Sequence, residues 1–127
     1  ENNGLKETAA KLHKGIITFS PLAQGLLTNR YLDGIPADSR VHTDGRFLKE
    51  KDITPEKIAK IHALNEIAAA RGQTLAEMAL AWLLSHEEIT TVLIGASKTQ
   101  QILDNIKAVQ NMKFTPEELA EIDRISK

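Results

Sequence analysis

Two short apolar runs interrupt a chain whose other regular segments repeat at the period of a helix. The runs are GIITFS, residues 15–20, and ITTVLIG, residues 89–95, and both are rich in β-branched side chains. Such runs are typical of strands that are covered on both faces in a parallel sheet. Because helical segments separate the two runs, the pattern predicts an α/β fold with parallel strands.

Three threonines mark helix starts. Thr54 stands before a proline at the first helical position, and this helix is expected to end at Gly72. Thr74 and Glu77 form the pattern of a capping box before LAEMALAWLLS, and Thr115 begins the last helix. Since LAEMALAWLLS is apolar over most of its circumference, we expect it to be buried.

Two further helices are expected, at residues 4–15 and 97–110. In the first, Leu5, Ala9 and Leu12 share one face. In the second, Ser97 and Gln100 fit a capping box. The apolar positions of the second helix are predicted to face inward; they are Ile102, Ile106 and Val109.

The segment between the first strand and Thr54 has no sustained period. It holds glycines, prolines, aspartates and arginines over more than thirty positions. Loops of this length are uncommon in compact domains unless they are functional, and a lid over a site has this composition. Two strands are also too few for a parallel sheet, so we expect further strands outside this chain, which opens directly into helical pattern without an initiator Met.

Composition excludes several classes of protein. The formal net charge is −1, from 16 basic and 17 acidic residues that are interleaved along the chain, so no basic block indicates a nucleic-acid or membrane-surface partner. There is no cysteine and no apolar run of membrane-spanning length, which favours a cytoplasmic protein. The four histidines have no metal-ligand spacing, and Tyr31 and Trp82 are expected to be packing residues.

The stretch VLIGASKTQQ, residues 92–101, indicates an anion site. Small residues follow a strand and precede a helix, so backbone N–H groups can approach a phosphate, and Lys98 adds a positive charge. On the next helix face Gln101, Asp104 and Asn105 could read the edge of a base. A plain helix cap and a solvated helix face explain the same residues, and the sequence leaves both interpretations open.

Two longer stretches carry a family resemblance. ITFSPLAQGLLTNRYLDGIPADSR and TTVLIGASKTQQILDN resemble the aldo-keto reductase family, in the branch of the potassium-channel β-subunits and the bacterial glyceraldehyde 3-phosphate reductases. The resemblance implies that residues 1–127 are the C-terminal portion of one (β/α)₈ barrel domain, with strands seven and eight at the two apolar runs. Barrels of this kind hold phosphate in the loops after those strands.

The resemblance also implies an NADPH site. The contacts after strand seven and in the clasping loop fall on Ser20, Pro21, Leu22, Ala23, Gln24, Arg30 and Arg40. Those after strand eight fall on Gly95, Ser97, Lys98, Gln101, Asp104 and Asn105, with Lys98 favouring the 2′-phosphate. Asp104 stands where relatives often have Glu, and Asp38 stands where the channel subunits have an aromatic residue.

The family's catalytic residues have no counterpart in this chain. They lie on the first strands of the barrel, and the surroundings of Tyr31 do not match the catalytic tyrosine. The resemblance therefore implies an NADPH-dependent reductase of small carbonyl compounds whose isolated C-terminal portion is inactive. We expect this portion to associate with the missing part of the barrel or with itself.

Two other functions remain open. The segment IAAARGQTLAEMALAWLL has the outline of a helix-turn-helix, although its second helix is apolar and the net charge offers no attraction to DNA. The chain is also compatible with a cofactor-binding interaction subunit that has no catalytic role.

Overall fold

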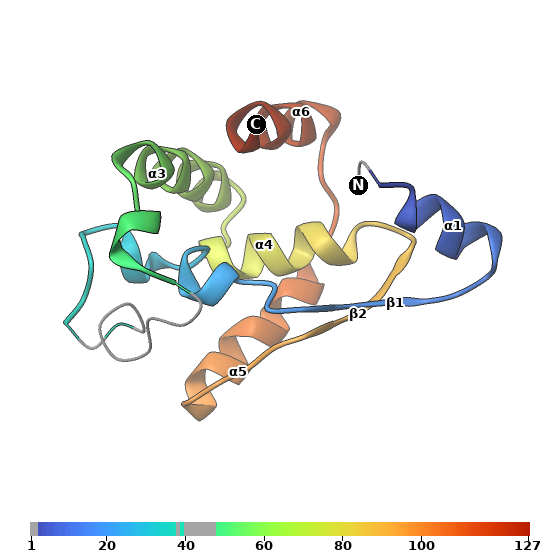
Figure 1. The fold of residues 1–127 in the computed structure, drawn as a ribbon, viewed down its shortest axis with the longest axis horizontal. Helices are drawn as coiled ribbons and strands as arrows, with labels where there is room; N and C mark the ends of the chain where they lie inside the picture. Colours follow the sequence, from blue (N-terminus) through green and yellow to red (C-terminus); the bar gives the residue numbers. More distant parts are fainter. Residues whose placement is uncertain (1–2, 38, 40–47) are drawn as a thin grey trace.

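The computed structural model describes residues 3–37, 39 and 48–127, and these form two strands and a set of helices (Figure 1). The strands are β1, Ile16–Phe19, and β2, Ile89–Leu93. The α-helices are α1, Leu5–Lys11; α3, Pro55–Ala70; α4, Leu75–Leu84; α5, Thr99–Asn105; and α6, Pro116–Ser126. Four 3₁₀ turns supplement them: η1, Ala23–Gly25; η2, Asn29–Tyr31; η3, Glu50–Asp52; and η4, Ile106–Gln110.

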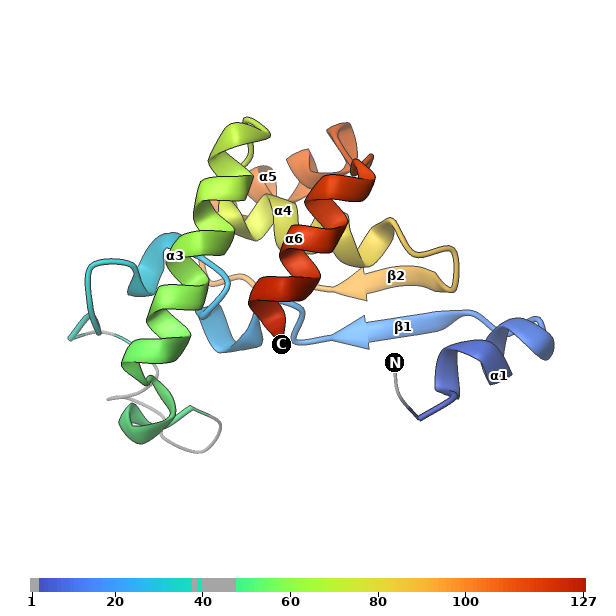
Figure 2. The ribbon, with the colours of Figure 1, turned by 90° about the horizontal axis from the view of Figure 1, so that it is seen from above.

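The two strands form a parallel pair, as the sequence predicted. Ile16 lies opposite Ile89 and Phe19 lies opposite Leu93, with an irregularity after Ile16. Helix α4 contacts β2 and lies along one side of the pair, whereas α1 stands at the far end of the strands, away from α3 (Figure 2).

The prediction that both strands are covered on both faces was wrong for the described residues. Ile17, Phe19 and Leu93 have exposed fractions of 66%, 81% and 63%. Side chains two positions apart on a strand share a face, and so do partners in register, so these three lie on one face of the pair. This open face is apolar, and α4 covers only the other one.

The hydrophobic core lies among α3, α4 and α6. Ile61, Ala68, Leu75, Met78 and Ile122 form its buried cluster. The predicted helix starts are confirmed: the Oγ1 atoms of the three capping threonines accept from the third helical N–H, and α4 and α6 carry complete capping boxes. Local sequence therefore fixes where these helices begin, and burial of their apolar faces holds them together.

A buried guanidinium fastens α6 to the turn between α3 and α4. The Arg71 side chain is 3% exposed, and its Nη1 lies 2.5 Å from Oε2 of Glu118. Its Nε donates to Gln73 over 2.9 Å and its Nη2 donates to the carbonyl of Asn111 over 3.1 Å, while the Phe114 ring lies 3.7 Å from the guanidinium carbon. Each of the three guanidinium nitrogens thereby has a hydrogen-bond partner.

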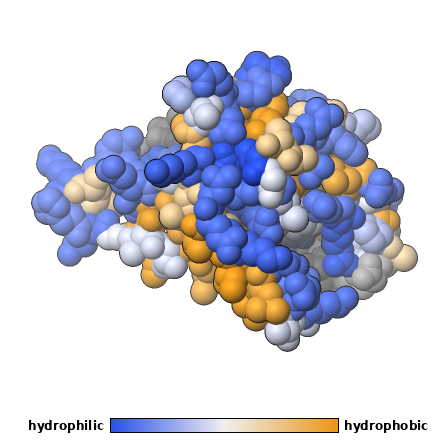
Figure 3. Space-filling model, turned by 180° about the vertical axis from the view of Figure 1, so that it is seen from behind, coloured by the Kyte–Doolittle hydropathy of each residue, from blue (hydrophilic) through white to orange (hydrophobic). Residues whose placement is uncertain are grey.

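The helix predicted at residues 97–110 begins two residues later than expected and changes from an α-helix to a 3₁₀ helix part-way along. α5 starts at Thr99 and gives way to the 3₁₀ turn η4 after Asn105. Its predicted inward stripe was wrong, because Ile102, Ile106 and Val109 are exposed while Asn105 and Ala108 are buried. α4 contacts both α5 and η4, and Ala108 belongs to a buried cluster with residues of α4. Figure 3 shows hydrophobic side chains gathered on the face seen from behind.

The first helix also differs from its prediction. α1 is shorter than expected, and only Ala9 of its apolar face is buried, whereas Leu5 and Leu12 are exposed. Most of its apolar face is therefore uncovered among the described residues.

The helix-turn-helix interpretation requires an exposed second helix. In this fold that helix is α4, and Leu75, Met78, Leu80 and Ala81 along it are buried. A helix so covered cannot enter a DNA groove. Within the part of the chain that is described, no helix combines the length and hydropathy needed to cross a membrane, and no group of three His, Asp or Glu side chains is placed to hold a metal ion.

Candidate functional site

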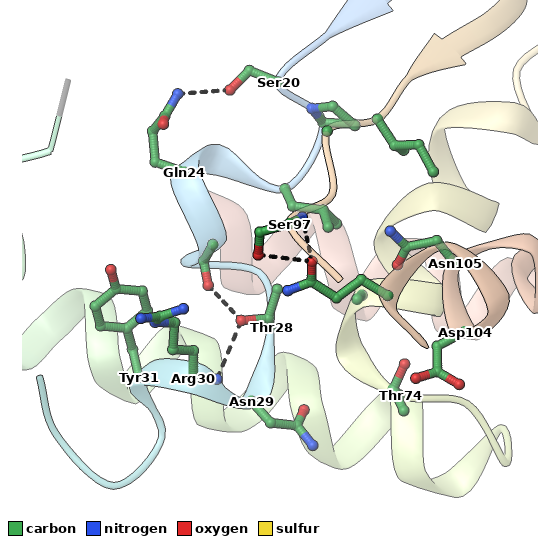
Figure 4. A pocket seen from close by; sticks show the side chains of 17 residues that line it. Ser20, Gln24, Thr28, Asn29, Arg30, Tyr31, Thr74, Ser97, Asp104 and Asn105 are labelled. Carbon is green, nitrogen blue, oxygen red and sulfur yellow. Dashed lines mark hydrogen bonds between the residues drawn. The ribbon is translucent and has the colours of Figure 1, made fainter. Parts of the chain in front are cut away.

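A pocket of about 460 Å³ opens where the two strands end (Figure 4). Its walls come from the segment after β1, from η2, from the first residues of α4, and from the segment that joins β2 to α5. The carboxyl ends of parallel strands are where ligands bind in α/β proteins, because loops and helix starts converge there. The pocket therefore lies where the sequence placed the anion site.

The wall after β1 has an unusual backbone. Ser20, Ala23 and Gln24 have φ values of 54°, 48° and 61°, and Gly25 follows at 96°. Left-handed conformations cost roughly 1–2 kcal/mol for each residue that is not glycine. Nε2 of Gln24 donates to Oγ of Ser20 over 2.9 Å, which holds the segment together. Strain of this kind concentrates at binding sites, where it presents backbone groups in a fixed arrangement.

The next wall is held by Thr28. Its Oγ1 donates to the carbonyl of Gly25 over 2.6 Å and accepts from the backbone N–H of Arg30 over 3.2 Å. Tyr31 is fully buried, and a Cβ on Gly25 would lie 3.6 Å from its ring. This burial agrees with the prediction that Tyr31 is a packing residue, although Tyr31 also lines the pocket and its hydroxyl is a buried atom without a hydrogen-bond partner.

The wall after β2 is closed by Gln101. Its Oε1 accepts from the backbone N–H of Ser97 over 2.8 Å, from the backbone N–H of Lys98 over 3.2 Å and from Oγ of Ser97 over 3.3 Å. The predicted cap was therefore wrong in detail: Lys98, not Ser97, is the N-cap residue, and Gln101, not Gln100, returns to the backbone. Gln100 instead donates to Asp104 over 2.9 Å.

Asp104 brings a carboxylate to the rim of the pocket. Its Oδ1 accepts from Nζ of Lys107 over 2.8 Å and from Nε2 of Gln100. The hydrogen bond from Lys107, and then that from Gln100, lower the pKa of the Asp104 carboxyl from its ordinary value, and the carboxylate raises the pKa of Lys107. Both groups are therefore charged at neutral pH.

Asn105 is a buried polar residue that lines the pocket. It is 9% exposed, and within the described part of the chain its carboxamide has no hydrogen bond to protein. In Figure 4 this carboxamide points into the pocket. The amide atoms stay accessible from the pocket, so its donor and its acceptor are both free to pair with a ligand.

The pocket brings together most of the residues predicted for the cofactor site. Those that line it are Ser20, Pro21, Leu22, Gln24, Arg30, Gly95, Ser97, Gln101, Asp104 and Asn105. Ala23 and Lys98 do not line it, although each is next in sequence to residues that do. Arg40 and Asp38 lie outside the described residues. The roles of all these residues stay predictions.

The sequence missed Thr28, Asn29, Thr74 and Ala76, which also line the pocket. Thr74 carried a signal, because its N-cap position marks the start of α4, but nothing local indicated that this helix start faces the strand ends.

Comparison with known proteins decides the family. The model of the aldo/keto reductase family matches residues 1–127. The chain belongs to this family. Family membership implies the barrel fold, and the parallel pair with flanking helices is consistent with part of a barrel.

Curated relatives of this aldo/keto reductase chain include enzymes and channel subunits. The L-glyceraldehyde 3-phosphate reductase of Escherichia coli O157:H7 is 47% identical over 127 residues, which cover 98% of this chain and 37% of that protein. A putative voltage-gated potassium channel subunit beta of Schizosaccharomyces pombe is 41% identical over 115 residues, covering 87% of this chain and 33% of that protein. The chain thus spans about a third of the length of these relatives.

Proposed function

We propose that this chain is the C-terminal portion of a longer NADPH-dependent reductase of small carbonyl compounds, and that it supplies the half of the cofactor site after strands seven and eight. Family membership and similarity to a reductase support the class of reaction. The short coverage of the relatives and the open apolar face of the strand pair support a missing remainder of the barrel.

The observation that carries the cofactor assignment is the carboxamide of Asn105, a residue that is 9% exposed and whose amide points into a pocket at the strand ends. Adenine offers both donors and acceptors on its edge, so it matches an amide that has both. Ser97, Lys98 and Arg30 would hold phosphate, and Asn105 with Asp104 would face the base. When bound, the cofactor supplies the hydride that reduces the carbonyl carbon.

An isothermal calorimetric titration of the chain with NADPH tests this assignment. Asn105→Ala removes the pairing groups, and we expect about 2- to 10-fold weaker binding, the equivalent of one neutral hydrogen bond. Asn65→Ala on α3, outside the pocket, is the matched control and should leave the affinity unchanged. Equal affinity for both variants and the parent chain would remove Asn105 from the site.

The chemistry needs a proton donor that this chain does not contribute in our proposal. Reduction of a carbonyl group requires an acid that protonates the oxygen as the hydride arrives. We therefore expect the 127 residues alone to oxidise no NADPH when an aldehyde is added. The assay is the decrease in the absorbance of NADPH with time. Steady turnover by the isolated chain would contradict the proposal that the proton donor lies in the other part of the barrel.

A second candidate is a cofactor-binding interaction subunit. The relatives named as potassium channel beta subunits, in Schizosaccharomyces pombe and rice, favour it. An assay of the longer protein distinguishes the two functions. A reductase oxidises NADPH in the presence of an aldehyde, whereas an interaction subunit binds NADPH without turnover.

A further inference from the structure

A polar contact joins His62 of α3 to the carbonyl of Leu32, in the loop after β1. Nε2 of the ring lies 2.9 Å from this oxygen, across 30 positions of sequence. A carbonyl group has no hydrogen to give, so Nε2 carries the proton and donates. Leu32 directly follows the 3₁₀ turn η2, whose residues line the pocket. We name residues 25–34 the η2 wall.

We propose that His62 is a positioning residue, which holds the η2 wall in place and thereby slows the release of a bound nucleotide. The proposal rests on the proposed function, because it takes the pocket to be a nucleotide site. It concerns a residue that does not line the pocket and that acts on it through the carbonyl of Leu32.

The hydrogen bonds inside the η2 wall are long. The backbone N–H of Leu32 donates to the carbonyl of Asn29 over 3.4 Å, and that of Gly34 donates to the carbonyl of Tyr31 over the same distance. Both exceed the usual range of about 2.7–3.2 Å. Hydrogen-bond geometry in 3₁₀ turns is also poorer than in an α-helix. A bond from α3 at the end of this turn therefore contributes a large share of what fixes its position.

The observed position of the η2 wall also carries a cost. Tyr31 is fully buried, and its hydroxyl has no hydrogen-bond partner in the part of the chain that is described. A buried polar group without a partner costs about 1–3 kcal/mol. Packing of Leu26 and Leu32 against the core cluster of α3, α4 and α6 offsets part of this cost. The bond from His62 adds a directional contact that apolar packing does not supply.

A shift of Leu32 would reach the surface that faces a ligand. Tyr31 precedes Leu32, and a Cβ on Gly25 would lie only 3.6 Å from the Tyr31 ring. Gly25 ends the left-handed segment after β1, and Arg30 projects from the same turn as Tyr31 (Figure 4). Loss of the His62 contact should therefore loosen the side of the pocket after β1 and leave the wall after β2 unchanged.

A purely stabilising contact would explain the same hydrogen bond. In that case its removal lowers the free energy of unfolding and leaves the kinetics of nucleotide binding to the folded chain unchanged. If His62 positions the wall, its removal raises the dissociation rate constant of the nucleotide, and a side chain that restores the donor restores the slow rate.

The test measures dissociation of NADPH from the 127-residue chain by stopped-flow fluorescence, with excess NADP⁺ to fill the emptied site. His62→Phe keeps a ring but removes the donor, and we expect dissociation to be about 2- to 10-fold faster, the equivalent of one neutral hydrogen bond. His62→Gln carries an amide N–H near the end of its side chain, so we expect it to restore most of the slow rate. Asn65→Ala, on the same helix and outside the pocket, is the matched control and should leave the rate unchanged.

The outcomes separate this inference from the proposed function. Faster dissociation with His62→Phe, restored by His62→Gln at equal helical circular dichroism, supports the positioning role. Equal rates for the parent chain and His62→Phe overturn this inference and leave the proposed function standing, and so does a faster rate that His62→Gln does not restore. Absence of NADPH binding by the parent chain overturns both.

Discussion

Replacing Arg71 by alanine is expected to lower the free energy of unfolding by about 2–3 kcal/mol, because it breaks charge-assisted hydrogen bonds of a buried guanidinium to partly buried partners. The substitution leaves Glu118 without its cation and the carbonyl of Asn111 without its donor. It also removes the contact of the guanidinium with the Phe114 ring. Urea unfolding followed by circular dichroism measures the change.

Arg124→Ala is the control for this result. Arg124 forms an ion pair with Glu121 within α6, but its side chain is 70% exposed, and exposed pairs contribute about 0–1 kcal/mol. Arg71→Lys keeps the charge but not the planar fork, so we expect a loss between the two. If Arg71→Ala costs no more than Arg124→Ala, the guanidinium does not fasten α6 to the rest of the fold.

Ile17→Asp is expected to act differently in the short chain and in the longer protein. In the 127 residues Ile17 is 66% exposed on the open face, so the change should stay within about 1 kcal/mol, the span of strand propensities. In a completed barrel the same side chain points into the packed interior. An unpaired buried charge there should cost about 3 kcal/mol or more, measured by urea unfolding of both proteins.

Ile17→Val supplies the comparison, because it keeps a β-branched apolar side chain and should cost about 0.5–1.5 kcal/mol where the position is buried. A loss with Ile17→Asp that is equally small in both proteins would show that the open face stays uncovered. The proposal of a missing barrel remainder would then fail.

The sequence predicted what is decided locally. Thr54, Thr74 and Thr115 cap helices through hydrogen bonds to residues three positions away, so a short window contains both partners. The parallel pairing followed from the order of strands and helices, and the pocket followed from the position of ligands at strand ends. The caps needed only a short window of sequence, and the pairing and the pocket needed only the order of the elements together with general rules of α/β folds.

The sequence failed where distant partners decide. Periodicity found the apolar stripe of residues 102–109 but could not know that α4 covers the side with Asn105 and Ala108 instead. Arg71 finds Asn111 and Glu118 some forty positions later, and no local pattern connects them. At the site, Gln100 and Gln101 are the same residue type one position apart, so only the actual start of α5 decides which one turns back to the backbone.

The pairing of β1 with β2 joins residue 16 to residue 89, and two of the three core helices, α3 and α4, lie between them in sequence. Closing so large a loop costs entropy before the strand contacts repay it, whereas α3 and α4 can form from near neighbours. The strands are therefore expected to meet late, after the helices have collapsed. Until they do, their apolar edges are available to other chains, so renaturation should succeed best at high dilution.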